Sequence, residues 1–121
     1  MQQRGIRGAT TIEADDRERV LSATRELLLA ILASNPDLEP RDVASALFTV
    51  TDDIASVYPA LAARQMGWDL VPMMCAREIP VTGSLPLCIR VLIQWNTEKK
   101  QDEIKHEYLR EAVQLRPDLK R

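Results

Sequence analysis

Two apolar runs, joined by a turn rich in proline and glycine, constrain the fold of this chain more than any other feature. They occupy residues 72–95, and residues 87–95 alternate with the two-residue period of a β-strand that is largely apolar on both faces. Each run nevertheless carries a charge, Glu78 near the end of the first and Arg90 in the middle of the second. A guanidinium buried without an anion costs several kcal/mol, so Arg90 requires a negatively charged partner.

Two different anions could satisfy Arg90. An internal ion pair with Glu78 would give both residues a structural role, whereas a bound anionic ligand would make Arg90 a functional residue. Arg7 poses a similar choice, because an arginine between Gly5 and Gly8 on a strand faces either solvent or a bound anion. The pattern of residues alone leaves both alternatives open.

The length and the charge of the chain limit its class. At 121 residues it forms one domain, residues 1–121, which buries only about two-thirds of its unfolded surface. Its apolar content of 45% is more than a small monomer easily hides, and this favours an oligomer. A net charge of −2 and a pI near 5.4 argue against nucleic acid and anionic membranes as partners.

Several kinds of site and segment are missing from the sequence. No apolar run approaches the roughly 20 residues of a membrane-spanning helix, and the first residues lack the apolar core of a secretion signal. We therefore expect a cytoplasmic protein in which Cys75 and Cys88 are reduced thiols. With His106 as the single histidine and no P-loop or GxGxxG motif, we expect no metal and no cofactor, and a structural role for His106.

Hydrophobic periodicity predicts one long helix after a first strand at residues 5–12. Asp15 and Glu18 have the spacing of an N-cap and its reciprocal partner, and Asn35 with Pro36 ends the helix. Seven residues recur on one stripe at the helical period, as in a helix packed on a sheet: Val20, Leu21, Thr24, Leu27, Leu28, Ile31 and Leu32.

The remaining elements complete an α+β pattern. A strand is expected at residues 46–50, a brief helix start at residues 51–53, and a helix at residues 60–66 that Gly67 closes. Intrinsic propensity favours a helix for residues 103–115, although the same residues alternate like a strand. One good helix covers only one face of such a sheet, so a neighbouring subunit is the economical cover for the other.

The chain resembles a known family through several sequence blocks in a fixed order. The family is the monofunctional chorismate mutases of the Bacillus type, the AroH class, and the resemblance runs from Arg4 to Leu119. The blocks are residues 4–11 (RGIRGATT), residues 71–72 (VP), Cys75, residues 77–83 (REIPVTG), residues 89–91 (IRV) and residues 115–119 (LRPDL).

This resemblance implies a fold, an assembly and a reaction. The fold would be α+β, a mixed sheet of about five strands with helices on the outer face, and residues 108–115 would be mainly turn and strand. Three chains would form a homotrimeric pseudo α/β barrel with active sites between neighbouring subunits. The enzyme, an isomerase, would convert chorismate to prephenate in aromatic amino-acid biosynthesis, by conformational selection and electrostatic stabilisation, without a cofactor or metal.

The resemblance also assigns roles to individual residues. Arg90 would contact the ether oxygen that gains negative charge as its bond to carbon breaks, Arg7 would bind a carboxylate of the enolpyruvyl group, and Glu78 would accept a hydrogen bond from the ring hydroxyl. Cys75 would contact the same hydroxyl and Tyr108 a carboxylate. The other implied substrate-binding positions are the walls Tyr58 and Leu115, the mouth arginines Arg64 and Arg116, and Met74.

Some residues depart from the family pattern, and other functions fit the same features. Tyr58 replaces a phenylalanine, and Leu61 replaces a lysine, so any carboxylate contact of that lysine is absent or taken over by another residue. A non-catalytic trimer that binds a small dicarboxylate would need the same basic cleft. A different enzyme on a similar trimeric scaffold, such as an imine deaminase, is a third alternative.

Overall fold

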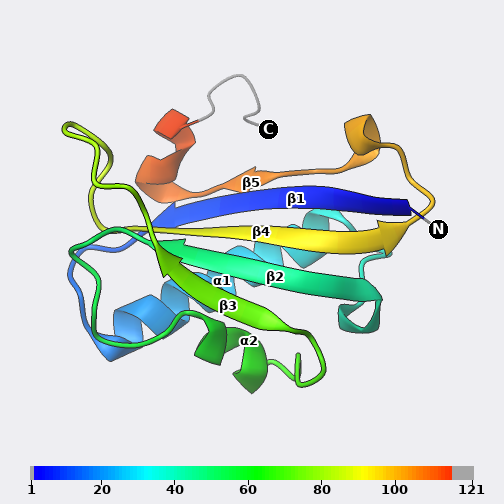
Figure 1. The fold of residues 1–121 in the computed structure, drawn as a ribbon, viewed down its shortest axis with the longest axis horizontal. Coiled ribbons are helices and arrows are strands. Elements are labelled where there is room, and N and C mark those ends of the chain that lie inside the picture. Colours follow the sequence, from blue (N-terminus) through cyan, green and yellow to red (C-terminus); the bar gives the residue numbers. More distant parts are fainter. Residues whose placement is uncertain (1, 116–121) are drawn as a thin grey trace.

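The computed structural model describes residues 2–115, which form a five-stranded mixed sheet in the order β3-β2-β4-β1-β5 (Figure 1). The central strand β4 pairs antiparallel with β1 and β2, while the outer strands β3 and β5 pair in parallel with β2 and β1. The sheet thus confirms the α+β class. The strand bounds are β1 (Gln2–Thr11), β2 (Val43–Val50), β3 (Met73–Arg77), β4 (Cys88–Thr97) and β5 (Glu107–Tyr108).

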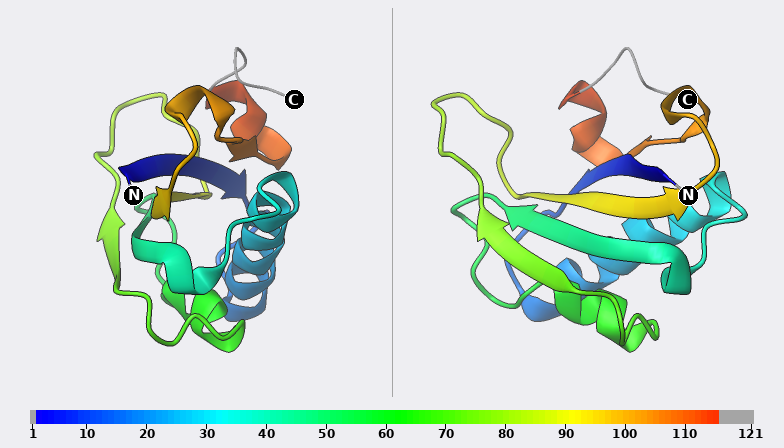
Figure 2. Two further views of the ribbon diagram at one scale, coloured as in Figure 1. Left: turned by 90° about the vertical axis from the view of Figure 1, so that its right-hand side faces the viewer. Right: turned by 45° about the vertical axis from the view of Figure 1, so that its right-hand side comes forward.

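Both α-helices lie on one face of the sheet (Figure 2). They are α1 (Arg17–Ser34) and α2 (Ala60–Gln65). The described residues also form three short 3-10 helices: η1 (Pro40–Asp42), η2 (Gln101–Glu103) and η3 (Arg110–Leu115). Within residues 2–115, no helix has the length and apolar character that crossing a membrane would require.

The core lies between α1 and the sheet. Six of the seven residues of the predicted stripe of α1 are buried, and Leu32 is partly buried. Leu27, Leu28 and Ile31 are fully covered and pack against Ile6 of β1 and Ile93 of β4. Burying each such side chain contributes about 1.5–3 kcal/mol, so this stripe holds α1 on the sheet.

The N-terminus of α1 differs from the prediction by one residue. Asp16, not Asp15, is the N-cap, and its carboxylate accepts a hydrogen bond from the backbone N–H of Arg19 at 2.9 Å. That bond is the main reason why the pKa of Asp16 is lowered. Asp15 instead accepts hydrogen bonds from the backbone N–H groups of Ala55 and Ser56, and so ties the start of α1 to the segment after β2.

Two other expected elements also differ from the structure. Residues 51–53 form a turn and no helix, and the side chains of Thr51 and Asp53 accept hydrogen bonds from the backbone at the start of β4. Residues 103–115 form neither one helix nor one strand: β5 is a strand of two residues, and Arg110–Leu115 is a 3-10 helix, where the resemblance implied mainly turn and strand. Arg110, the first residue of η3, has a φ of 55°, in the left-handed region.

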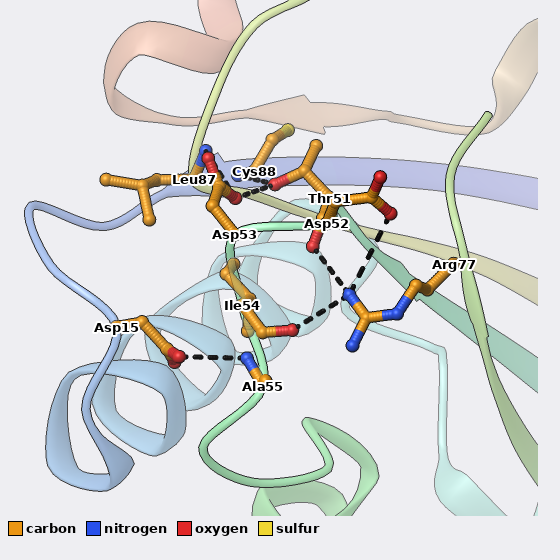
Figure 3. Close-up of polar contacts among 9 residues, drawn as sticks. All are labelled: Asp15, Thr51, Asp52, Asp53, Ile54, Ala55, Arg77, Leu87 and Cys88. Carbon is orange, nitrogen blue, oxygen red and sulfur yellow. Dashed lines mark hydrogen bonds and ion pairs between the residues drawn. The ribbon is translucent and has the colours of Figure 1, made fainter. Parts of the chain in front are cut away.

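The turn after β2 holds both ends of the loop between β3 and β4 (Figure 3). At one end, Arg77 donates hydrogen bonds to the carbonyls of Thr51 and Ile54, at 3.2 and 3.1 Å. At the other end, both carboxylate oxygens of Asp53 accept the N–H of Leu87, at 3.1 and 3.0 Å.

Leu87 needs such a restraint. Its φ of 50° lies in the left-handed region, which costs a residue other than glycine about 1–3 kcal/mol. The adjacent N–H of Cys88 is bound by the hydroxyl of Thr51 at 3.0 Å, so the start of β4 is fixed at two successive residues. The turn therefore sets where β4 begins.

The face of the sheet away from the helices is uncovered in the single chain. Met74, Leu47 and Leu92 lie on it and are 71%, 38% and 36% exposed. Leu47 pairs in register with both Met74 and Leu92, so the three side chains form one apolar band across β3, β2 and β4.

Replacing Gly8 by alanine tests the packing of α1 on β1. A Cβ there would lie 2.8 Å from Cδ1 of Ile31 and 3.2 Å from Cδ1 of Leu27, so Gly8→Ala should lower the free energy of unfolding by about 1–3 kcal/mol through overpacking. Gly5→Ala is the matched control, since its Cβ would meet only Leu92 at an ordinary 3.5 Å. Urea unfolding measures both, and equal stability of the two variants would contradict this packing.

Replacing Asp53 by alanine tests the restraint on Leu87. Loss of the carboxylate leaves the left-handed residue unsupported, so Asp53→Ala should cost about 1–2 kcal/mol of stability. Glycine adopts this φ without strain, so the cost should shrink markedly when Asp53→Ala is made in a Leu87→Gly background. Thermal unfolding measures this cycle, with Asp52→Ala as the control for charge, and equal costs in both backgrounds would refute the restraint.

Candidate active site

A hollow opens on the uncovered face of the sheet, where several of the predicted site residues meet. Its volume is about 230 Å³. It lies over β1, β2, β4 and β5 and the residue that follows β3, and its lining includes Arg7, Thr49, Glu78, Arg90 and Tyr108. The antiparallel pairing of β1 and β4 creates this meeting, because Arg90 lies opposite Ala9, and Ala9 is two residues from Arg7 on the same face of β1.

Arg90 and Glu78, which both line the hollow, form an ion pair. Nε of Arg90 lies 3.5 Å from Oε2 of Glu78, and the two side chains are 33% and 25% exposed. The sequence left open an internal Arg90–Glu78 pair or a bound anionic ligand. The internal pair is present, and it lies beside a hollow that a ligand could enter. The pair is a charge contact only, because Nε of Arg90 makes no hydrogen bond to Glu78 or to any other described residue.

Two buried polar atoms in the lining lack a hydrogen-bond partner. In the part of the chain that the structure describes, three buried side-chain atoms are in this state: Nε of Arg90, Oη of Tyr108 and Oγ1 of Thr10. Each such group costs about 1–3 kcal/mol relative to a satisfied one. Two of the three line the same hollow, so a ligand with acceptor oxygens there would recover hydrogen bonds that the chain alone does not make.

The thiol of Cys88 lies beside Arg90 on the same face of β4. It is fully buried, and burial raises the pKa of this thiol, while the charge of Arg90 acts in the opposite direction. Cys88 is therefore neutral at physiological pH and does not neutralise the guanidinium. Both Cys88 and Cys75 are free thiols, as predicted from the sequence.

Arg7 and Tyr108 reach the hollow from neighbouring strands. The backbone N–H of Arg7 donates to Nδ1 of His106 at 3.0 Å, which is a structural role for this histidine, as predicted. Tyr108 belongs to β5 and pairs with Ala9 of β1. It packs with Leu115 of η3 in a cluster that includes Ala9, Cys88 and Ala112, so η3 supports this side of the site.

Other predicted site residues lie elsewhere in the single chain. Tyr58 and Cys75 line a second hollow of about 540 Å³, and Cys75 packs against the core between the sheet and the helices. Met74 is exposed on the face of the first hollow, and Arg64 is exposed on α2. Arg116 lies outside the described residues. One chain thus unites Arg7, Glu78, Arg90 and Tyr108, and leaves Tyr58, Cys75 and Arg64 apart.

Two residues of the site were missed from the sequence. Thr49 lines the hollow and its hydroxyl donates a hydrogen bond to Oε2 of Glu78. Asp53 holds the end of the loop that begins with Glu78. The TxTDD pattern at residues 49–53 offered a signal, because threonine and aspartate after a strand commonly bond to nearby loop backbone.

Comparisons with known proteins agree on one family. The family model described as chorismate mutase type I matches residues 3–119. The chain is 56% identical over 116 residues to the chorismate mutase AroH of Thermus thermophilus, covering 96% of this chain and 95% of the relative. It is 47% identical over 120 residues to the chorismate mutase AroH of Bacillus subtilis, covering 98% and 94% of the two chains.

A comparison with solved structures points to the same family. A chorismate mutase from Clostridium thermocellum superposes on this chain with a TM-score of 0.87 and 44% sequence identity. The match covers 89% of this chain and 96% of that one, so the sheet and the helices that position the hollow are shared.

Proposed function

The chain belongs to the chorismate mutase type I family and is an isomerase that converts chorismate to prephenate, and we propose that the hollow around Arg90 is where it does so. The reaction breaks a carbon–oxygen bond while a carbon–carbon bond forms within one molecule. It therefore needs no nucleophile, and the protein contributes by holding the substrate folded and by stabilising developing charge.

Arg90 is the residue that stabilises the transition state in this proposal. Its guanidinium lies on the central strand, and its Nε is a buried donor without a hydrogen-bond acceptor. The ether oxygen of chorismate gains negative charge as its bond breaks, and a fixed donor in a dry site favours that state over the ground state. The unpartnered atoms of Arg90 and Tyr108 are the single observation that carries this assignment.

Arg7 and Tyr108 bind the substrate carboxylates. Chorismate carries two carboxylates, and the planar fork of an arginine can bind one of them with two hydrogen bonds. Arg7 is exposed at one side of the hollow, and the buried hydroxyl of Tyr108 has a hydrogen bond to donate. With Arg90, these groups fix the enolpyruvyl side chain over the ring, which lowers the entropic part of the barrier.

Glu78 accepts a hydrogen bond from the ring hydroxyl. Its carboxylate faces Arg90 at 3.5 Å, which orients the guanidinium without consuming the hydrogen bond of Nε. A carboxylate here also balances part of the positive charge when no substrate is bound. The ring hydroxyl is the neutral end of the substrate, so it suits the acidic side of the hollow.

The complete site lies between subunits of a homotrimer that acts in the cytoplasm. The hollow of one chain is smaller than the roughly 300–1,000 Å³ of typical ligand pockets, and the apolar band beside it is uncovered. Tyr58, Cys75 and Arg64 are apart from Arg90 within one chain, but a neighbouring chain can bring its own copies to the hollow. Three such contacts close a ring, the pseudo α/β barrel.

Removing Arg90 tests its role. Arg90→Ala should lower kcat/KM at least about 10²–10³-fold, because a charged donor to the developing oxyanion is lost. Arg41→Ala, at an exposed arginine on η1, should leave the rate unchanged. The decrease of chorismate ultraviolet absorbance measures the rate, and light scattering should find the same oligomer for both variants. Full activity of Arg90→Ala would refute the assignment, and a wild-type rate equal to the uncatalysed background would refute the function.

Mixing two inactive variants tests whether the site is shared between chains. Tyr58 is 73% exposed, and Tyr58→Asp places a negative charge where we expect a dianion to enter. When Tyr58→Asp and Arg90→Ala chains are unfolded and refolded together, about a quarter of the sites should combine an intact hollow with an intact neighbour, and activity should return to that level. Sites contained within single chains would instead leave the mixture as inactive as the separate variants.

A further inference from the structure

Thr49 lines the hollow, and the proposed function gives it no role. It belongs to β2 and lines the hollow, and it pairs in register with Arg90 on one side and with Ala76 on the other. Its hydroxyl donates a hydrogen bond to Oε2 of Glu78. The sheet therefore places one hydroxyl beside both the acid and the cation of the site.

Glu78 needs an external restraint more than the other residues of the hollow do. Arg7, Arg90 and Tyr108 are on strands, whereas Glu78 follows the last residue of β3 and begins a loop. Its backbone is held by one hydrogen bond to the carbonyl of Val50 at 2.9 Å, and the loop beyond it is open, with Ile79 80% exposed. A glutamate side chain in such a place has several rotamers unless another group selects one.

We propose that Thr49 is a positioning residue, which fixes the carboxylate of Glu78 for the ring hydroxyl of the substrate; this inference rests on the proposed function of Glu78. The hydroxyl of Thr49 and Nε of Arg90 both approach the same oxygen, Oε2. Oε1 takes part in neither contact and is the oxygen that meets the substrate. The hydrogen bond from Thr49 also stabilises part of the negative charge on Oε2. Glu78 then offsets less of the positive charge of Arg90, which can act on the ether oxygen.

A double-mutant cycle between Thr49 and Glu78 tests this role. Thr49→Val keeps the shape of the side chain and removes the hydroxyl, and it should lower kcat/KM roughly tenfold, the low end for a hydrogen bond to a charged group. Thr49→Ser restores the hydroxyl and should restore the rate. In a Glu78→Ala background, Thr49→Val should change the rate less than about twofold, because the group on which it acts is gone. Ser45→Ala, on the same strand and outside the hollow, is the matched control.

The outcomes separate this inference from the proposed function. Full activity of Thr49→Val, or the same tenfold loss in the Glu78→Ala background, would overturn the positioning role of Thr49. The proposed role of Glu78 would not be affected by either result. Full activity of Glu78→Ala would overturn the role of Glu78 itself. A loss of activity that Thr49→Ser fails to restore, with a lowered unfolding midpoint, would assign Thr49 to folding alone and would also overturn the inference.

Discussion

The contact between Arg90 and Glu78 is the interaction on which the rest of the site depends. A guanidinium on the central strand of a sheet is tolerable only beside an anion, and Glu78 supplies that anion at 3.5 Å. The contact balances charge yet leaves Nε of Arg90 without a hydrogen bond. This combination balances the charge of Arg90 and leaves its Nε available to the ligand that we propose for this site.

The order of the strands in the sheet brings the other residues of the proposed site to this contact. Antiparallel pairing puts Arg90 between Ala9 of β1 and Thr49 of β2, and the parallel outer strands bring Tyr108 to one side and Glu78 to the other. The helices occupy the opposite face, where the core supplies the stability. The face that carries the proposed site is also the one that a neighbouring chain is proposed to cover, so the proposed assembly and the proposed catalysis involve the same surface.

Periodicity in the sequence predicted the elements whose burial is regular, and it was wrong where local side-chain bonds decide the structure. The stripe of α1 and the alternation of β4 were recovered because packing follows a fixed period. The shift of the N-cap to Asp16 and the turn at residues 51–53 depend on which backbone N–H each carboxylate reaches. Asp16 bonds to nearby Arg19, but Asp15 and Asp53 bond to Ala55 and Leu87, which are distant in sequence. The ion pair of Arg90 was considered, but the register that gathers Arg7, Thr49 and Tyr108 around it is set by the whole sheet.

The most direct measurement is a crystal structure of the protein with prephenate bound. The central claim is that the buried Nε of Arg90 and the hydroxyl of Tyr108 are unpartnered because they serve the ligand. The predicted result is a hydrogen bond of about 2.7–3.2 Å from each of these atoms to an oxygen of prephenate, in a cleft that a second chain completes. A ligand bound elsewhere, with both atoms satisfied by protein groups or by water, would contradict the claim.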